Sequence, residues 1–261
     1  MKIALVSIAY NQPESIERLF AGASRIQHRL RFHLFLHSQH APTMAACERI
    51  ATDPRVQYHA HGKNHGVSRS WNEGMLEAYA EGADVVIIAN DDIEIDSRNV
   101  DRLAAKAAGC RDRYIVTCAG WHHRLNRRLP SHGYACFAIN PIALDSIGCF
   151  DENFFPAYCE DQDYARRAAL AGLVEENCAD TDVRHLGSAA IFAEPSLRRQ
   201  NAITHGRNSA YYRRKWGGDA GQERFTCPFD DGRFDHCIAP ARRHAPYGSG
   251  LDRTDHEIVR M

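Results

Sequence analysis

The acidic turn Asn90-Asp91-Asp92 is the first group of residues whose types and spacing could do chemistry. It directly follows an apolar run, residues 84–89 (DVVIIA), which has the composition of a buried strand. Carboxylates at the mouth of a sheet suit Mg²⁺ or Mn²⁺, which bind proteins through one or two carboxylates together with phosphate oxygens. A turn in which an aspartate caps the next helix would use the same residues, so the turn alone leaves both interpretations open.

A second acidic group, Glu160, Asp161 and Asp163, lies at the start of an expected helix over residues 161–171. Acidic residues favour helix N-termini through capping and the helix dipole, which needs no function. Carboxylates crowded this closely repel one another and exceed what a cap requires. The group therefore also suits a catalytic base for a substrate hydroxyl, and the spacing does not separate the three candidates.

Histidine and aromatic residues supply further candidates. His185, in the stretch 182–188 (DVRHLGS), is by itself typical of a packed or surface histidine, and a metal-ligating role for it depends on the two acidic groups. Trp121 and His122 follow an expected strand over residues 115–119. Aromatic faces stack on sugar rings, so an acceptor platform and a loop aromatic packed on the core both fit.

The elements that must position these residues alternate between strand and helix in the first half of the chain. Strands are predicted at Lys2–Ala9, 31–37, Val56–Ala60 and 84–89, and helices from Pro13, over 43–52 and at Val67–Ala80. This alternation predicts a parallel sheet with helices on both faces. Ligands of such sheets bind outside the carboxyl ends of the strands, where the turn at Asn90 lies.

The second half is less regular. Strands are predicted over 115–119 and 135–140, helices at Pro141–Ile147 and 161–171, and further helical stretches from Ser196. A proline- and glycine-rich tail follows Gly217. The tail contains Cys227, His236, Cys237 and His244, which are zinc-competent residue types at a spacing that matches no familiar site. Unpaired residues in a loose tail and a structural zinc site are both left open.

Length and composition narrow the class of protein. The chain has 261 residues, of which 44% are hydrophobic and 25% charged, as expected for one large α/β domain or one domain with a small appendage. The formal net charge of -1 argues against bulk nucleic-acid binding. No apolar run reaches the roughly 20 residues that span a bilayer. The nine cysteines form no CxxC pair, which favours reduced thiols in a cytoplasmic protein that could still attach to the inner face of a membrane.

In their order along the chain, the motifs resemble family 2 of the glycosyltransferases, which are nucleotide-sugar-dependent enzymes of the GT-A fold. The resemblance extends from the first strand to about Gly218. It is carried by residues 7–11 (SIAYN), 64–74 (NHGVSRSWNEG), 90–92 (NDD), 148–155 (GCFDENFF) and 160–167 (EDQDYARR), and by His185. No single motif is decisive, whereas the ordered set is specific.

The resemblance implies a fold and a division of the chain. The expected fold is α/β, GT-A and Rossmann-like, with a mixed, mostly parallel sheet flanked by helices. The glycosyltransferase domain would span residues 1–218, with a nucleotide-binding half (1–92) and an acceptor half (93–218). Residues 219–261 would form an irregular C-terminal extension.

The resemblance also implies a reaction. A sugar would pass with inversion from a UDP-, dTDP- or GDP-linked donor to an acceptor hydroxyl, by default on a growing polysaccharide or a lipid-linked glycan. Asp92 and His185 would bind Mn²⁺ or Mg²⁺, and Asp161 would be the base, with Glu160 and Asp163 as alternatives. The nucleotide sugar would be bound by Tyr10, Asn11, Asn64, Arg69, Asn72, Asn90 and Asp91, and the acceptor by Trp121 and His122.

Two departures and two rival classes complete the sequence-based picture. Where the family usually has an aspartate after the second strand, this chain has His37-Ser38-Gln39, and Asn90 replaces the first acid of the metal motif. One rival is a degenerate GT-A domain that binds carbohydrate or protein without catalysis. The other is a sugar-phosphate nucleotidyltransferase, which would need a glycine-rich, basic loop after the first strand. Residues 9–15 contain neither glycine nor a basic residue.

Overall fold

The computed structural model describes residues 1–26, 29–187 and 195–238. The strands are β1 (Lys2–Ala9), β2 (Arg29–Leu36), β3 (Val56–Ala60), β4 (Val85–Ala89), β5 (Ile93–Glu94), β6 (Ile115–His122), β7 (Arg127–Leu129), β8 (Cys136–Ile139) and β9 (Glu176–His185). The helices are α1 (Pro13–Ala23), α2 (Ala41–Ile50), α3 (Val67–Ala80), α4 (Ser97–Gly109), α5 (Pro141–Ile147), α6 (Glu160–Leu170) and α8 (Pro195–Trp216), with short 3₁₀ turns at Gly133–Ala135 and Pro228–Asp230.

All nine strands belong to one mixed sheet with the order β3-β2-β1-β4-β8-β6-β9-β5, and β7 pairs with β6 outside this path. The strands β3, β2, β1 and β4 are parallel to one another, as the alternating pattern of the first half predicts. The strand β8 then runs antiparallel between β4 and β6. The sheet is therefore not purely parallel, and the mixed GT-A architecture expected from the resemblance describes it better than a uniform parallel sheet.

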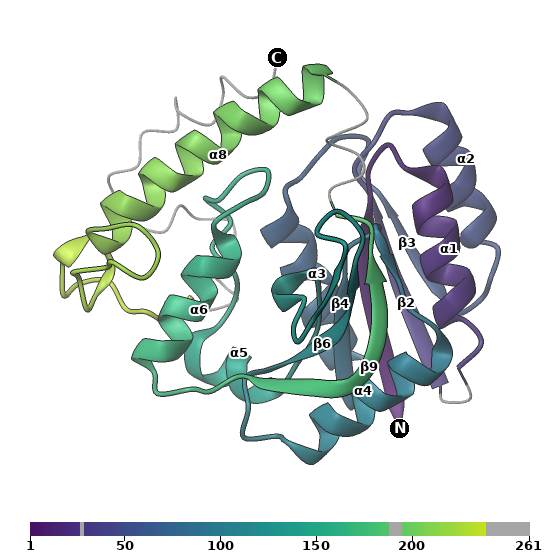
Figure 1. The fold of residues 1–261 in the computed structure, drawn as a ribbon, viewed down its shortest axis with the longest axis horizontal. Helices are drawn as coiled ribbons and strands as arrows, with labels where there is room; N and C mark the ends of the chain where they lie inside the picture. The colour runs from purple at the N-terminus through teal and green to yellow at the C-terminus, as the bar shows by residue number, and fades with distance from the viewer. Residues whose placement is uncertain (27–28, 188–194, 239–261) are drawn as a thin grey trace.

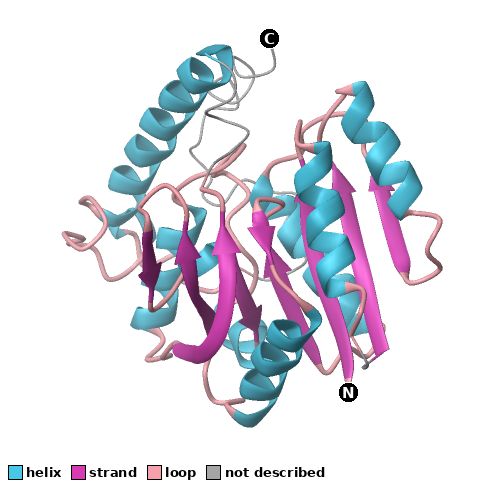
Figure 2. Ribbon diagram, turned by 45° about the vertical axis from the view of Figure 1, so that its right-hand side comes forward, coloured by secondary structure: helices cyan, strands magenta, loops and turns pink. Residues whose placement is uncertain are grey.

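Helices cover both faces of this sheet (Figures 1 and 2). Alternate residues of β1 enter different cores, since Ile3 and Leu5 pack with α1, α2 and α4, whereas Ala4 and Val6 pack with α3, α5 and α6. Successive side chains of a strand point to opposite faces, so a fully apolar strand such as β1 needs a helix layer on each side. The predicted fold class is confirmed.

The long helix α8 lies on the α6 side of the molecule, away from α1 and α2 (Figure 1). Its last turns pack Tyr211, Tyr212 and Trp216 into a small apolar core with Phe154 and Cys159. The stretch 211–217 is therefore a packing element. No described helix of the chain is long and apolar enough to cross a membrane.

The segment after α8 folds back onto the domain as far as it is described. Ile238 is buried, and its backbone carbonyl accepts a hydrogen bond of 2.8 Å from the amide of Cys149. Within the described residues, Cys227, His236 and Cys237 belong to no cluster with metal-ligand spacing, and His244 lies outside the described residues. The division at residue 218 stays a prediction.

Candidate functional site

A cavity of about 550 Å³ lies at the carboxyl ends of β1 and β4. Many of the residues singled out in the sequence line it: Tyr10, Asn64, Asn90, Asp91, Asp92, Glu160, Asp161 and His185. These residues come from both halves of the chain and converge because β4, β8, β6 and β9 are successive neighbours in the sheet. The cavity is thus the place where the sequence motifs meet.

Asp92 and His185 face each other across this cavity. The short strand β5 pairs antiparallel with the end of β9, which sets Ile93 opposite His185. The amide of Leu186 donates a hydrogen bond of 3.0 Å to the backbone carbonyl of Asp92. These pairings hold the Asp92 carboxylate 3.4 Å from Nε2 of His185. Ligand atoms bonded at about 2.1 Å to one cation lie about 3 Å apart, so the pair fits a shared divalent ion.

Asp91 holds the turn to the neighbouring strand. Its carboxylate accepts a hydrogen bond of 3.1 Å from the backbone amide of Tyr10, which ties the end of β4 to the end of β1. Burial, and then the neighbouring charge of Asp92, raise the pKa of Asp91 to about 8. A carboxyl group that is largely protonated at neutral pH is a weaker cation ligand than Asp92.

The second acidic group stands on a strained turn before α6. Tyr158 and Cys159 both have left-handed backbones, with φ of 83° and 69°. The side-chain amide of Asn208, on α8, donates hydrogen bonds of 2.7 and 3.0 Å to the backbone carbonyls of Ala157 and Tyr158. Strained backbone of this kind persists only where its surroundings hold it. The turn directs Glu160 and Asp161 to the cavity.

Glu160 and Asp161 differ in their surroundings. Glu160 is buried, and one of its carboxylate oxygens has no hydrogen-bond partner. Burial, followed by the charge of Asp161, raises the pKa of Glu160 to about 8. Asp161 is less buried, accepts a hydrogen bond of 2.8 Å from the amide of Gln162, and also has its pKa raised by burial. Of the two, Asp161 is the carboxylate more readily ionised at neutral pH.

Asp163 does not line the cavity. Its carboxylate is fully buried and contacts Arg167 at 2.8 Å, Lys215 at 2.6 Å and the indole nitrogen of Trp216 at 2.9 Å. Lys215 also pairs with the buried Asp151 at 2.8 Å. This network joins α6 to α8, and a carboxylate so fully paired is a structural anchor. The structure therefore does not place Asp163 as a base.

Three of the residues expected at the nucleotide sugar lie outside the lining of the cavity. Asn72 is fully buried and clasps the loop after α5, donating to the carbonyl of Phe150 at 3.0 Å and accepting from its amide at 2.8 Å. Asn11 accepts a hydrogen bond from the hydroxyl of Ser38. Arg69, on α3, is near enough to His37 to lower the pKa of that ring. We assign Asn72 and Asn11 to holding loops.

The two residues expected to bind the acceptor, His122 and Trp121, point to opposite faces of β6. His122 pairs in register with His185, and their ring centroids are 4.8 Å apart, beside the proposed cation ligands. Trp121 precedes it on β6, so its side chain points to the other face of the strand, where it is 38% exposed. Neither residue lines the cavity, and the acceptor role stays a prediction for both.

The cavity also contains residues that sequence reasoning missed. They are His37, Trp71, His132, Tyr134 and Tyr158, together with Gln200, Asn201 and Thr204 from α8. His37 begins the stretch His37-Ser38-Gln39, which stands where an aspartate was expected after β2, and its ring bonds the hydroxyl of Ser70 at 2.7 Å. His132 is buried with neither ring nitrogen hydrogen-bonded. Its position in the basic, aromatic stretch 120–133 was the available signal.

Residues 5–145 match the family model of Glycosyl transferase family 2. The chain belongs to this family. A segment of 78 residues is also 33% identical to a galactofuranosyl glycosyltransferase from Leishmania donovani. That segment covers 30% of this chain and only 17% of the relative, so the relative's activity is not transferred with it.

Solved structures show the same fold as this family-2 chain. A mannosyltransferase from Pyrobaculum calidifontis, in complex with GDP-Man and Mn²⁺, has a TM-score of 0.58 at 16% identity, covering 80% of this chain and 64% of that one. TarS from S. aureus in complex with UDP has a TM-score of 0.58 at 13% identity, covering 85% and 74%. Glucosyl-3-phosphoglycerate synthase from Mycobacterium tuberculosis, with Mn²⁺ and UDP, has a TM-score of 0.53 at 12% identity, covering 79% and 78%.

Proposed function

We propose that this family-2 chain transfers a sugar, with inversion, from a nucleoside-diphosphate sugar to an acceptor hydroxyl with the help of Mn²⁺ or Mg²⁺. The observation that carries the proposal is the convergence of two chemical groups on one cavity. Asp92 and His185 form a pair suited to a cation, and Asp161 and Glu160 supply carboxylates from α6. The similar structures named above contain GDP-Man or UDP, two of them with Mn²⁺, which supports this donor class.

Asp92 and His185 would bind the divalent cation. Their donors are a carboxylate oxygen and an imidazole nitrogen, a set that suits Mn²⁺ and accepts Mg²⁺ less readily because Mg²⁺ prefers oxygen ligands. A divalent cation held there would neutralise the negative charge that develops on the leaving diphosphate. The hydrogen bond to the backbone carbonyl of Asp92 and the pairing of β5 with β9 would keep the two ligands in place without help from the substrate.

Asp161 is our choice for the base that removes the acceptor proton. Glu160, with its pKa near 8, holds its own proton at neutral pH and is a poor proton acceptor there. Asp163 is engaged in the buried network with Lys215. The N-terminus of α6 favours a negative charge on Asp161 through the helix dipole. A protonated Glu160 could instead donate a hydrogen bond to the donor sugar.

The nucleotide would occupy the part of the cavity between β1, β2 and α8. Tyr10, His37 and Asn64 line the cavity, as do Asn201 and Thr204 of α8. The pKa of His37 is lowered to about 3, chiefly by burial, so its ring stays neutral and reads its ligand through hydrogen bonds. An aspartate at this place would offer only acceptors, so His37 gives this chain a different base contact from that usual in the family.

A turnover assay tests the proposal. Purified protein is incubated with Mn²⁺ and UDP-, dTDP- or GDP-linked sugars, and release of the nucleoside diphosphate is measured with and without added glycan acceptors. We expect release with one donor class, its abolition by EDTA, and a loss of at least about a hundredfold in Asp161→Asn, as expected for removal of a general base. Asp145→Asn, on α5 outside the cavity lining, is the matched control.

Thermal shifts separate an enzyme from a binding module. A nucleoside diphosphate that binds the folded chain with its cation raises the melting temperature only when Mn²⁺ is present. Stabilisation without turnover in any acceptor mixture would favour the non-catalytic module. Absence of both stabilisation and turnover would reject the transferase. Formation of a nucleotide sugar from sugar phosphate would instead favour a nucleotidyltransferase.

A further inference from the structure

A row of histidines and glutamates, His33, His59, His61, Glu73 and Glu77, lies outside the cavity just described. His33 is on β2, His59 is on the edge strand β3, His61 follows β3, and the two glutamates are one turn apart on α3. The residues His59 and His61 are two positions apart, which puts both side chains on one face of the chain, and that face meets α3. The row is built from three elements.

The spacing within the row fits a metal ion better than it fits hydrogen bonds. One carboxylate oxygen of Glu77 is 3.4 Å from Nε2 of His59 and 3.5 Å from Nδ1 of His33. Both distances exceed the usual N–H···O length of about 2.9 Å. Ligand atoms at about 2.0 Å from a tetrahedral Zn²⁺ lie about 3.3 Å from one another. One ligand atom from each of the three residues lies within 4.8 Å of the other two, so they can close around one ion by a small movement of the side chains.

Several histidine nitrogens in this row are buried and make no hydrogen bond. His33 is fully buried, and neither of its ring nitrogens makes a hydrogen bond; Nε2 of His59 is likewise buried without one. Leaving a buried polar group unsatisfied costs about 1–3 kcal/mol, so a fully buried imidazole in this state points to a bound ligand. The Glu77 oxygen that faces the two histidines also accepts a hydrogen bond of 3.1 Å from the side-chain amide of Gln57, which fixes its position.

A plain ion pair does not account for the row. A hydrogen-bonded ion pair would bring a ring N–H to about 2.9 Å from the carboxylate oxygen, whereas Nδ1 of His33 and Nε2 of His59 lie 3.5 and 3.4 Å from Glu77. Two imidazoles and a carboxylate are a set that zinc favours.

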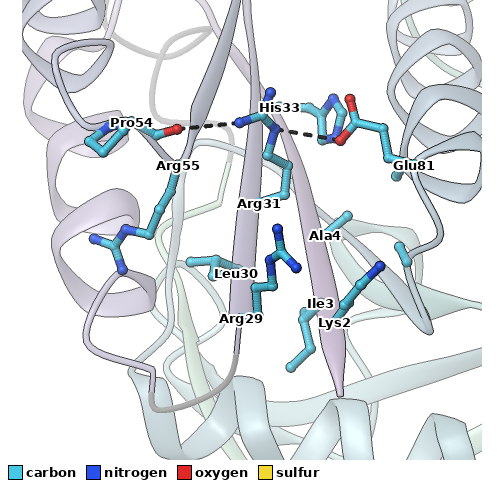
Figure 3. A pocket seen from close by; sticks show the side chains of 12 residues that line it. Lys2, Ile3, Ala4, Arg29, Leu30, Arg31, His33, Pro54, Arg55 and Glu81 are labelled. Carbon is cyan, nitrogen blue, oxygen red and sulfur yellow. Dashed lines mark hydrogen bonds and ion pairs between the residues drawn. The ribbon is translucent and has the colours of Figure 1, made fainter.

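A second, smaller cavity gives one side of this row an opening. It has a volume of about 310 Å³, lies at the amino ends of β1 and β2, and has His33 in its lining together with Arg31 and Glu81. Figure 3 shows His33 extending from β2 toward α3, next to the ion pair between Arg31 and Glu81. The Glu77 side chain is 35% exposed, so an ion also has a route past α3.

We propose that His33, His59 and Glu77 bind one Zn²⁺ ion, separate from the cation of the transferase site. The ion would join the edge strand β3 to β2 and α3. The loop from β3 to α3 carries His61 and Asn64, and Asn64 lines the larger cavity, so the ion would also brace one wall of the nucleotide pocket. Zn²⁺ uses no residue of the proposed transfer reaction, and either proposal can fail without the other.

The test is calorimetric titration of Zn²⁺ into the Asp92→Asn variant, which lacks a proposed ligand of the other cation site. We expect one Zn²⁺ per chain. Glu77→Gln and His59→Gln should each weaken this binding by at least about tenfold, since even changes beyond the ligands cost about 10–100-fold. The matched control is Glu81→Gln, the same change four residues further along, directly after α3, which should bind Zn²⁺ as tightly as the parent. Added Zn²⁺ should also raise the melting temperature of the parent and of Glu81→Gln, and not that of Glu77→Gln.

Three results would overturn the proposal. One is the absence of Zn²⁺ binding in Asp92→Asn. Another is equal affinity in Glu77→Gln and Glu81→Gln. The third is that His61→Gln loses Zn²⁺ binding while Glu77→Gln keeps it. That result would place the ion at the neighbouring group His59, His61 and Glu73. Glu77 is partly exposed, so its variant is expected to fold, and circular dichroism checks this for every variant.

Discussion

Two aspartates that lie two positions apart on α6 have opposite environments. Asp161 lines the cavity, whereas Asp163 is fully buried against Arg167, Lys215 and Trp216. The acidic cluster alone could not separate them, because two of the partners of Asp163, Lys215 and Trp216, come from α8, far along the chain. A sequence pattern shows spacing, and here the distinction depends on which side of the helix a later element covers.

This difference predicts opposite effects of the same substitution. Asp163→Asn removes the carboxylate from the buried Arg167 and one of the two carboxylates from the buried Lys215, and should lower the free energy of unfolding by about 3–5 kcal/mol. Asp161→Asn should change the stability by less than about 1 kcal/mol and abolish turnover, since its carboxylate makes no ion pair in the described structure. Urea denaturation measures the first effect and the donor assay the second. Equal destabilisation by both variants would contradict this assignment.

Glu160 makes stability depend on pH. Its carboxyl binds a proton more tightly in the folded chain, where the pKa is about 8, than in the unfolded chain, where it is 4.5. The contribution is fully present at low pH, and the free energy of unfolding falls as the pH rises through this window, by up to about 1.4 kcal/mol per pH unit. Glu160→Gln, which keeps an uncharged side chain of similar shape, should remove that part of the slope between about pH 5 and about pH 8. Urea denaturation in the presence of EDTA, repeated across this pH range, measures the slope. The same slope in Glu160→Gln and the parent would contradict the raised pKa of Glu160.

At the scale of elements, α8 holds the turn that precedes the acidic start of α6. Asn208 donates both amide hydrogens to the carbonyls of Ala157 and Tyr158, directly before the acidic start of α6. Asn208→Ala leaves two carbonyls without partners and should cost about 1–3 kcal/mol of stability. It should also lower kcat by about tenfold or more, because Asp161 loses its fixed position. A loss of stability with kcat unchanged would show that the turn holds its geometry without α8.

Gly206 supplies the matched control in the same helix. It lies on the exposed side of α8, and a methyl group added there would meet no atom within 4 Å. Alanine has a higher helix propensity than glycine, so Gly206→Ala should stabilise the chain by about 0.5–1 kcal/mol and leave kcat unchanged. Urea denaturation and turnover are measured for Gly206→Ala and for Asn208→Ala. The comparison separates an effect of helix rigidity on kcat from an effect of the Asn208 hydrogen bonds to the turn.

The elements differ in how well the sequence predicts them. The bounds of β1, α3 and α5 follow from their apolar patterns, since β1 buries residues in both cores and each helix buries a face in one of them, while β3 packs only Val56 and Tyr58 against the first core. The helix α4 escaped prediction although Val100, Leu103, Ala104 and Ala107 have helical spacing and Asp96 caps its start. The strand β9 lacks such a pattern, because its polar sequence (ENCADTDVRH) is ordered by pairing with β6. Long-range pairing of this kind is not encoded in local periodicity.

At the scale of the whole molecule, the sheet brings together residues that the chain keeps far apart. Asp92 follows β4, and His185 is the last residue of β9. In the strand order β4-β8-β6-β9-β5, the short strand β5 directly after Asp92 is the neighbour of β9. The sequence motifs predicted that both residues belong to one site, whereas their separation of 3.4 Å depends on the pairing of β5 with β9. The close approach of Asp92 and His185 is therefore a property of the tertiary fold.

This arrangement predicts that Asp92 and His185 act as a unit. Each single variant, Asp92→Asn or His185→Gln, should weaken Mn²⁺-dependent binding of the nucleoside diphosphate by at least about tenfold, because one remaining ligand holds the cation poorly. The double variant should lose much less than the product of the two single effects, with a coupling energy of about 0.5–3 kcal/mol. Calorimetry with the diphosphate that gives the Mn²⁺-dependent thermal shift measures all four corners of the cycle. Arg128→Gln, which removes a surface ion pair with Asp182 near the same sheet end, should bind like the parent. Strictly additive losses would mean that the two side chains act on the ligand separately and share no cation.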